Sequence, residues 1–296
     1  MASWQAHAAD LFLRATVKRR LKNNTDLADV RAALNGTMPP PKNVQVHADI
    51  VGGVPGEWVR SEASPANAPT LLYLHGGGYF ACSPRTHRSI SAFFARAGFA
   101  VFVPDYRLAP EHPFPAALDD ALAAWQGLRD GGRAAKHMAV AGDSAGGGLS
   151  LALLLKLRDL GQELPAAAAL FSPWTDLAAT GASVQENADH DAMFWAAGIP
   201  AGAAHYIGTD DARNPLISPL YGDMHGLPPL LIHCGQREIL RDDGTRVAAK
   251  AQAAGVSVSL RVWDVVPHVW QIAHRLVPEG RESLAEAAAF IRAEIE

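Results

Sequence analysis

The chain has 296 residues, of which 49% are hydrophobic, and this is enough to build the core of one large α/β domain. Its net charge is −4, and it has no basic patch of the kind that binds phosphates, so a nucleic-acid partner is not expected. Cys82 and Cys234 are too few for a disulfide framework, which predicts free thiols in a reducing compartment and favours a cytoplasmic location.

The N-terminal segment has helical periodicity. Leu13, Val17 and Leu21 recur at helical spacing, which predicts an amphipathic helix rather than a signal peptide. The basic cluster at residues 18–20 leaves a membrane-surface role open, but no apolar run reaches about 18 residues, so stable membrane insertion is not expected. A second helix is expected over Thr25–Gly36, with Thr25 as its candidate N-cap.

After two expected strands at Val44–Ile50 and Glu57–Arg60, short apolar runs alternate with helical segments from Pro69 onward. This alternation is typical of βαβ units and of a mainly parallel sheet flanked by helices. The further strands are expected at Thr70–Leu74, Ala100–Val103, Met138–Ala141, Ala166–Phe171, Pro229–His233 and Val256–Val262. The helices are expected at Thr86–Ala97, Pro115–Arg129, Ala145–Leu160, Asp242–Ala254 and Glu282–Ile295. In sheets of this kind, ligands bind beyond the carboxyl ends of the strands.

The interval Asp176–Asp223 interrupts this rhythm, because it has no clear strand and is rich in aromatic residues. We interpret it, together with about residues 1–42, as a helical cap on a single domain spanning 1–296, and we expect the cap to enclose an apolar cavity. The alternative is that these aromatic side chains only pack the excursion onto the core. The candidate pocket residues are Tyr79, Phe80, Asp143, Phe194, Trp195, Tyr206 and Trp270.

The stretch Gly142-Asp143-Ser144-Ala145-Gly146 lies between a strand-like run and a long helical segment. A G-x-S-x-G in that position is a nucleophile elbow, which makes Ser144 the candidate nucleophile. Glycines two residues before and after the serine keep the flanking strand and helix from colliding. The helix begins directly after Ser144, so the amide of Ala145 would favour an anion there.

His75-Gly76-Gly77-Gly78-Tyr79 directly follows the first central strand. Consecutive glycines let the backbone aim its amides into a cavity, so we expect Gly76 and Gly77 to form an oxyanion hole with Ala145. A plain glycine turn or a phosphate cradle would be the competing interpretation. No Gly-Lys-Ser/Thr follows, which argues against the phosphate cradle.

The order of these motifs, with Tyr106-Arg107-Leu108-Ala109-Pro110-Glu111 between them, resembles the GDSAG branch of the bacterial hormone-sensitive lipase family. The resemblance runs from about Val44 to the C-terminus. It implies an α/β-hydrolase fold with a helical cap, and a serine carboxylesterase for short- to medium-chain acyl esters that needs no cofactor. A lactone hydrolase or an amidase would use the same residues. A non-catalytic receptor for small molecules is the alternative from another class, and a homodimer is plausible by family analogy.

A serine nucleophile needs a histidine base and an acid that orients it, and in this fold they follow in the order serine, acid, histidine. His268 follows the last expected strand and is the candidate base, whereas no pair of histidines has metal-ligand spacing, so no metal site is expected. The segment 235–242 resembles the family's G-x-x-D-x-L-x-D, with Glu238 at the acid position. Asp242 and Asp264 are the alternative acids. With an unperturbed histidine, activity would fall as the pH drops through roughly 6.5.

Overall fold

The computed structural model describes residues 2–23, 26–36 and 41–295. Its strands form one sheet in the order β1-β2-β4-β3-β5-β6-β7-β8. The antiparallel pairs are β1–β2 and β2–β4, so only β2 runs opposite to the other strands, and the predicted mainly parallel sheet is confirmed. The strands are β1 (Val44–Val51), β2 (Val54–Ser61), β3 (Thr70–Leu74), β4 (Ala100–Pro104), β5 (Met138–Asp143), β6 (Ala167–Phe171), β7 (Leu230–Gly235) and β8 (Val258–Trp263).

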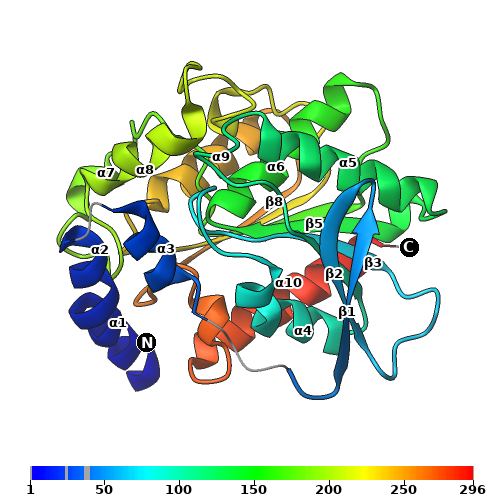
Figure 1. Cartoon of the computed structure of the whole chain (residues 1–296), viewed down its shortest axis with the longest axis horizontal. Helices are drawn as coiled ribbons and strands as arrows, with labels where there is room; N and C mark the ends of the chain where they lie inside the picture. The colour runs from blue at the N-terminus through cyan, green and yellow to red at the C-terminus, as the bar shows by residue number, and fades with distance from the viewer. Residues whose placement is uncertain (1, 24–25, 37–40, 296) are drawn as a thin grey trace.

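Helices cover both faces of the sheet (Figure 1). On one face lie α5 (Ala116–Asp130), α6 (Ala145–Asp159) and α9 (Arg241–Ala253), and on the other α4 (Arg88–Arg96) and α10 (Pro278–Glu294). Successive side chains of β3 alternate between the two layers, with Leu72 and Leu74 packing on one face and Leu71 and Tyr73 on the other. Because both faces are covered, all five side chains of β3 are buried, as in the near-continuous apolar strands of parallel sheets.

The N-terminal helices lie beside the excursion that follows β6 (Figure 1). They are α1 (Trp4–Leu13), a π-helical turn (Arg14–Lys18), α2 (Arg19–Asn23) and α3 (Leu27–Leu34). Lys18 donates to the backbone carbonyls of Ala188 and Asp191, and Arg14 donates to the carbonyl of Asp189. The excursion contains α7 (Ser183–Glu186) and α8 (Gly198–Ile207). Segments far apart in the sequence are thereby joined at one end of the sheet.

Most predicted elements end within a few residues of the observed ones, and the differences have local causes. Asp26 caps α3 by accepting from the amide of Ala28, whereas the predicted cap Thr25 lies outside the described residues. α10 begins at Pro278, earlier than predicted, since proline suits the first turn of a helix. Short 3₁₀ turns occupy Pro84–His87, Ala135–His137, Pro219–Tyr221 and Trp270–Ala273. Within the described ranges, no helix combines the length and apolarity needed to cross a bilayer.

Candidate active site

Ser144 occupies the sharp turn between β5 and α6, with φ 52° and ψ −122°. The turn brings backbone so close that glycine is needed on both sides. A Cβ on Gly142 would lie 2.3 Å from the carbonyl oxygen of Gly146, and a Cβ on Gly146 would lie 2.0 Å from that of Leu74. The strain at Ser144 is therefore imposed by its surroundings, and it holds the serine at the carboxyl edge of the sheet.

His268 and Glu238 form a buried pair at the same edge. The Nδ1 atom of His268 lies 2.6 Å from Oε2 of Glu238, and both side chains are at most 3% exposed. The other carboxylate oxygen, Oε1, accepts from the Ser172 hydroxyl at 2.7 Å and from the Gly235 amide at 2.6 Å. An ionised carboxylate only accepts, so the proton sits on Nδ1 of His268. In the part of the chain that the structure describes, Nε2 of His268 has no hydrogen-bond partner, and its lone pair is free.

The electrostatics of His268 reflect two opposing effects. Burial by itself would lower its pKa, but the hydrogen bond and the negative charge of Glu238 outweigh burial, with smaller contributions from Asp191 and Asp143. The pKa of His268 is therefore raised above the ordinary 6.5. This corrects the sequence-based expectation of an unperturbed histidine.

The two alternative acids lie elsewhere. Asp242 accepts from the amide of Ser183 at 2.9 Å and pairs with Arg241, while Asp264 is exposed. No hydrogen bond joins either carboxylate to His268. Of the three acids weighed from the sequence, Glu238 is the one that contacts the imidazole.

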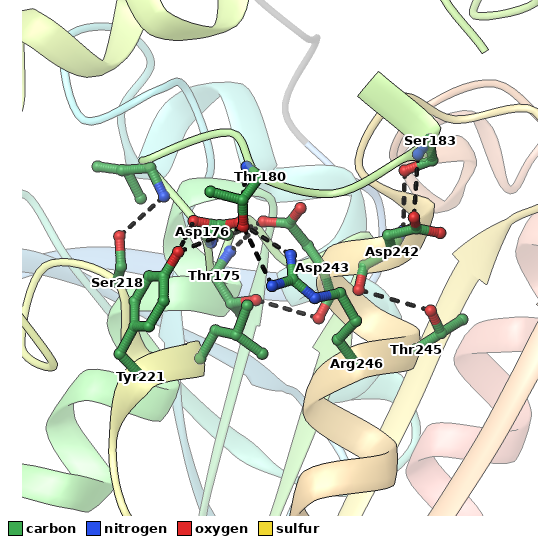
Figure 2. A network of polar contacts seen from close by, with 12 residues as sticks. Thr175, Asp176, Thr180, Ser183, Ser218, Tyr221, Asp242, Asp243, Thr245 and Arg246 are labelled. Atoms are coloured by element: carbon green, nitrogen blue, oxygen red, sulfur yellow. Dashed lines mark hydrogen bonds and ion pairs between the residues drawn. The ribbon is translucent and has the colours of Figure 1, made fainter. Parts of the chain in front are cut away.

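A buried polar network holds the segment after β6 against the start of α9 (Figure 2). The carboxylate of Asp243 accepts from the backbone amides of Thr175 and Asp176, both at 2.7 Å. Asp176 in turn pairs with Arg246 at 2.9 Å and accepts from the Tyr221 hydroxyl at 2.9 Å. Since α9 begins three residues after Glu238, this network fixes one side of the turn that carries the acid.

Two residues of the excursion, Asn187 and Asp191, form hydrogen bonds to the turn that contains Glu238. Neither was singled out from the sequence. Asn187 donates to the carbonyls of Gln236 and Glu238, at 3.0 and 2.8 Å. Asp191 accepts from the amide of Ile239 at 2.8 Å. Both are buried polar residues in an irregular segment, so only the three-dimensional contacts reveal their role.

The glycine loop after β3 has one paired amide, that of Gly76, and two unpaired amides, those of Gly77 and Gly78, among the residues described. The amide of Gly76 donates to Oδ1 of Asp143 at 3.2 Å, so it is not available to a ligand. The amides of Gly77, Gly78 and Ala145 have no hydrogen-bond acceptor among the residues described. Gly77 and Gly78 have φ of 121° and 64°, values that favour glycine. The free amides are therefore those of Gly77, Gly78 and Ala145, with Gly78 in place of Gly76.

The side chain of Asp143 connects the serine turn to this glycine loop. Besides the Gly76 amide, Oδ1 accepts from the Tyr73 hydroxyl at 2.7 Å, and Oδ2 lies 3.2 Å from Nε2 of His87. Burial alone would raise the pKa of Asp143, but the His87 and Tyr73 side chains hold it below its usual value. Through its side chain, Asp143 thus fixes the glycine loop next to the turn that carries Ser144.

Ser144 and His268 line a single cavity of about 970 Å³, together with Gly77 and Gly78. Four of the predicted pocket residues line this cavity: Phe80, Asp143, Phe194 and Trp270. The edge of the Phe194 ring packs on His268, with ring centroids 4.9 Å apart. The N-terminal helices supply much of the remaining wall, with Trp4, Ala8, Phe12, Leu13 and Val17.

The other three predicted pocket residues do not line the cavity. Tyr79 and Tyr206 stack on each other with ring centroids 3.7 Å apart, and each is only 1% exposed within the core. Trp195 packs over the backbone of Gly198. The stack of Tyr79 on Tyr206 packs the excursion onto the domain, which is the alternative that the sequence left open, whereas Trp195 packs within the excursion itself.

No group of three or more His, Cys, Asp or Glu side chains that could hold a metal ion occurs in the described ranges. The cavity wall is mostly apolar. Its polar side chains are those of Ser144, His268, Asp143 and His87 near the serine, and those of Gln5 and Arg275 elsewhere in the lining. Such a lining suits an uncharged organic ligand.

Comparison with known proteins places this geometry in context. A protein family described as having the α/β hydrolase fold matches residues 71–272 of this chain. An acetyl-hydrolase of Streptomyces hygroscopicus is 44% identical over 243 residues, covering 82% of this chain and 81% of that protein. An esterase of Acinetobacter venetianus is 34% identical over 293 residues, covering 97% and 96%. The crystal structure of an esterase from the bacterial hormone-sensitive lipase family superposes with a TM-score of 0.94 at 40% identity and covers 100% of both chains.

Proposed function

Because the chain belongs to the bacterial hormone-sensitive lipase family of α/β-hydrolase esterases and is a carboxylic ester hydrolase, we propose that it cleaves short- to medium-chain acyl esters through an acyl-enzyme formed on Ser144. The observation that carries the proposal is the His268–Glu238 pair at 2.6 Å, whose free Nε2 belongs to the same cavity as Ser144.

In the first step, the hydroxyl of Ser144 attacks the ester carbonyl and its proton passes to Nε2 of His268. Glu238 keeps the other ring nitrogen protonated and stabilises the imidazolium that forms. The carbonyl oxygen becomes an oxyanion, and the amides of Gly77, Gly78 and Ala145 bind it. Each such donor contributes about 2.7–4 kcal/mol to lowering the barrier.

His268 then protonates the leaving alcohol, and the acyl group stays on Ser144. In the second step, His268 takes a proton from water, the resulting hydroxide attacks the acyl carbonyl, and the acid is released. Ser144 recovers its proton, so both steps use the same residues.

The apolar wall supports an uncharged acyl group, and the volume of about 970 Å³ leaves room for chains longer than acetyl. A series of p-nitrophenyl esters of increasing acyl length, run beside a few lactones, tests this part of the proposal. We expect the highest kcat/KM at a short or medium chain and slower opening of lactones. A preference for lactones would replace the carboxylesterase assignment with a lactone hydrolase that uses the same triad.

We also propose that about residues 1–42 and 176–223 act together as a cap on a single domain. The hydrogen bonds of Lys18 to the carbonyls of Ala188 and Asp191 support this, since they join the two segments. A cytoplasmic location is proposed from the two free cysteines, and a homodimer from the position of β8 at the edge of the sheet.

A further inference from the structure

Exposed apolar side chains gather at the mouth of the cavity. Seven large apolar residues of the described chain are at least 37% exposed, and four of them are Trp4 at 75%, Leu11 at 67%, Phe12 at 63% and Leu276 at 77%. Trp4, Phe12 and Leu276 also line the cavity. We call these four residues the apolar rim. An exposed apolar patch that continues into a ligand cavity indicates an interaction surface.

The rim follows from the periodicity of α1. Trp4, Leu11 and Phe12 are spaced at i, i+7 and i+8, so they share one face of a regular helix, and the exposed Ala8 lies between them. The opposite face is anchored, since Ala6 and Asp10 are buried and Arg14, which pairs with Asp10, donates to the backbone carbonyl of Asp189 in the excursion. The helix is therefore held on the protein while its aromatic face points to solvent.

The charge around the rim differs in sign from the charge of the whole chain. Residues 1–36 contain six basic and three acidic side chains, whereas the complete chain has a net charge of −4. Arg19, Arg20 and Lys22 on α2 are exposed, and so is Arg275, which lines the cavity mouth next to Leu276. A surface that joins exposed Trp, Phe and Leu with basic residues has the composition of a helix that lies in a membrane interface.

We propose that the apolar rim docks the mouth of the cavity on an anionic phospholipid bilayer, with α1 lying in the plane of the interface. A second copy of the chain fits this surface less well, because symmetric pairing would bring like-charged basic residues face to face. Anionic headgroups instead complement Arg19, Arg20, Lys22 and Arg275. Esters dissolved in the bilayer would then enter the cavity without crossing water.

The test uses the full-length protein and vesicles of phosphatidylcholine alone or mixed with phosphatidylglycerol. Cosedimentation measures binding without hydrolysis. A change in tryptophan emission reports mainly on Trp4, which is 75% exposed, because Trp195 is only partly exposed and the other five tryptophans are buried. We expect binding to the anionic vesicles only, reduced by salt, with a blue shift of the emission. Binding to neutral vesicles of equal strength would overturn the proposal, and so would the absence of binding to anionic ones.

Variants separate docking from folding and from catalysis. The double variant Arg19→Gln/Arg20→Gln should bind anionic vesicles about 30-fold more weakly, at about 1 kcal/mol for each arginine. Leu11→Ser should weaken binding about tenfold, since the leucine no longer enters the interface. Neither change touches the cavity wall, so hydrolysis of soluble p-nitrophenyl acetate should be unchanged. The matched control is Ile50→Ser on β1, a position 69% exposed that lies outside the rim.

A loss of binding in Ile50→Ser equal to that in Leu11→Ser would overturn the proposal. Sedimentation velocity provides a second test. If the unmodified protein is a dimer and Leu11→Ser is a monomer, a second copy of the chain covers the apolar rim, and the proposal is contradicted. The proposed function gives membrane docking its biological role, but vesicle binding itself does not depend on ester hydrolysis. Vesicle binding without ester hydrolysis would refute the proposed function alone, whereas hydrolysis of soluble esters without vesicle binding would refute docking alone.

Discussion

Replacing Glu238 with glutamine tests the orientation of the imidazole. Oε1 of Glu238 accepts from the Ser172 hydroxyl and the Gly235 amide, and Oε2 accepts from Nδ1 of His268. In Glu238→Gln, the amide oxygen has to stay at the Oε1 position, because a backbone N–H at 2.6 Å needs an acceptor there. The side-chain NH₂ group then faces His268.

An NH₂ group only donates, so Nδ1 of His268 must accept and its proton moves to Nε2. That tautomer cannot take the proton of Ser144. Turning the amide around would restore the acceptor for His268, but it would leave the buried Gly235 N–H against another donor, at a cost of about 1–3 kcal/mol. The wrong tautomer is therefore favoured, and we expect kcat to fall about 10⁴-fold, which corresponds to about 5.5 kcal/mol of transition-state stabilisation.

The assay is the hydrolysis of p-nitrophenyl butyrate under saturating conditions, with urea unfolding as the check on the fold. Asp242→Asn is the matched control, because it makes the same chemical change four residues along, at a carboxylate that contacts Ser183 and Arg241. We expect the control to keep kcat within about tenfold. A Glu238→Gln variant as active as the control would refute the assignment of the acid.

Ser144→Ala should lower kcat by about 10⁶-fold, the scale of losing a triad nucleophile, and retention of a tenth of the rate would contradict the assignment. Because the pKa of His268 is raised and only the neutral imidazole acts as a base, kcat/KM should fall on the acid side with a midpoint above 6.5. A pH–rate profile with its midpoint at or below 6.5 would show that Glu238 does not raise the pKa in this way. Asp143→Ala leaves the Tyr73 hydroxyl and the Gly76 amide without their acceptor, so the free energy of unfolding in urea should drop by about 3 kcal/mol. An unchanged unfolding midpoint would count against that contact.

The sequence was sufficient for features whose signal is local. The serine turn is predictable because its glycines are needed at fixed offsets from Ser144, and the contacts at Gly142 and Gly146 give the reason. The contact between Glu238 and His268 is predictable because each residue follows a strand whose carboxyl end lies at the same edge of the sheet. The alternation of buried strands and helices likewise determines the fold class.

Features that depend on pairing across the chain were not predictable. The amide of Gly76 is taken by Asp143, 67 residues away, and no pattern near either residue shows it. Tyr79 and Tyr206 were expected in the pocket because they are aromatic and lie near its motifs, but they stack on each other in the core. The raised pKa of His268 depends on a carboxylate 30 residues away at 2.6 Å.

The most direct test of the central claim is to identify the atom that a phosphorylating ester analogue modifies. The protein is incubated with diethyl p-nitrophenyl phosphate, digested and analysed by mass spectrometry, with Ser144→Ala treated in parallel. We predict one diethylphosphoryl group, on the peptide that contains Ser144, formed as activity is lost and absent from the variant. A stoichiometric adduct on another residue, or full loss of activity with Ser144 unmodified, would contradict the assignment of Ser144 as the nucleophile.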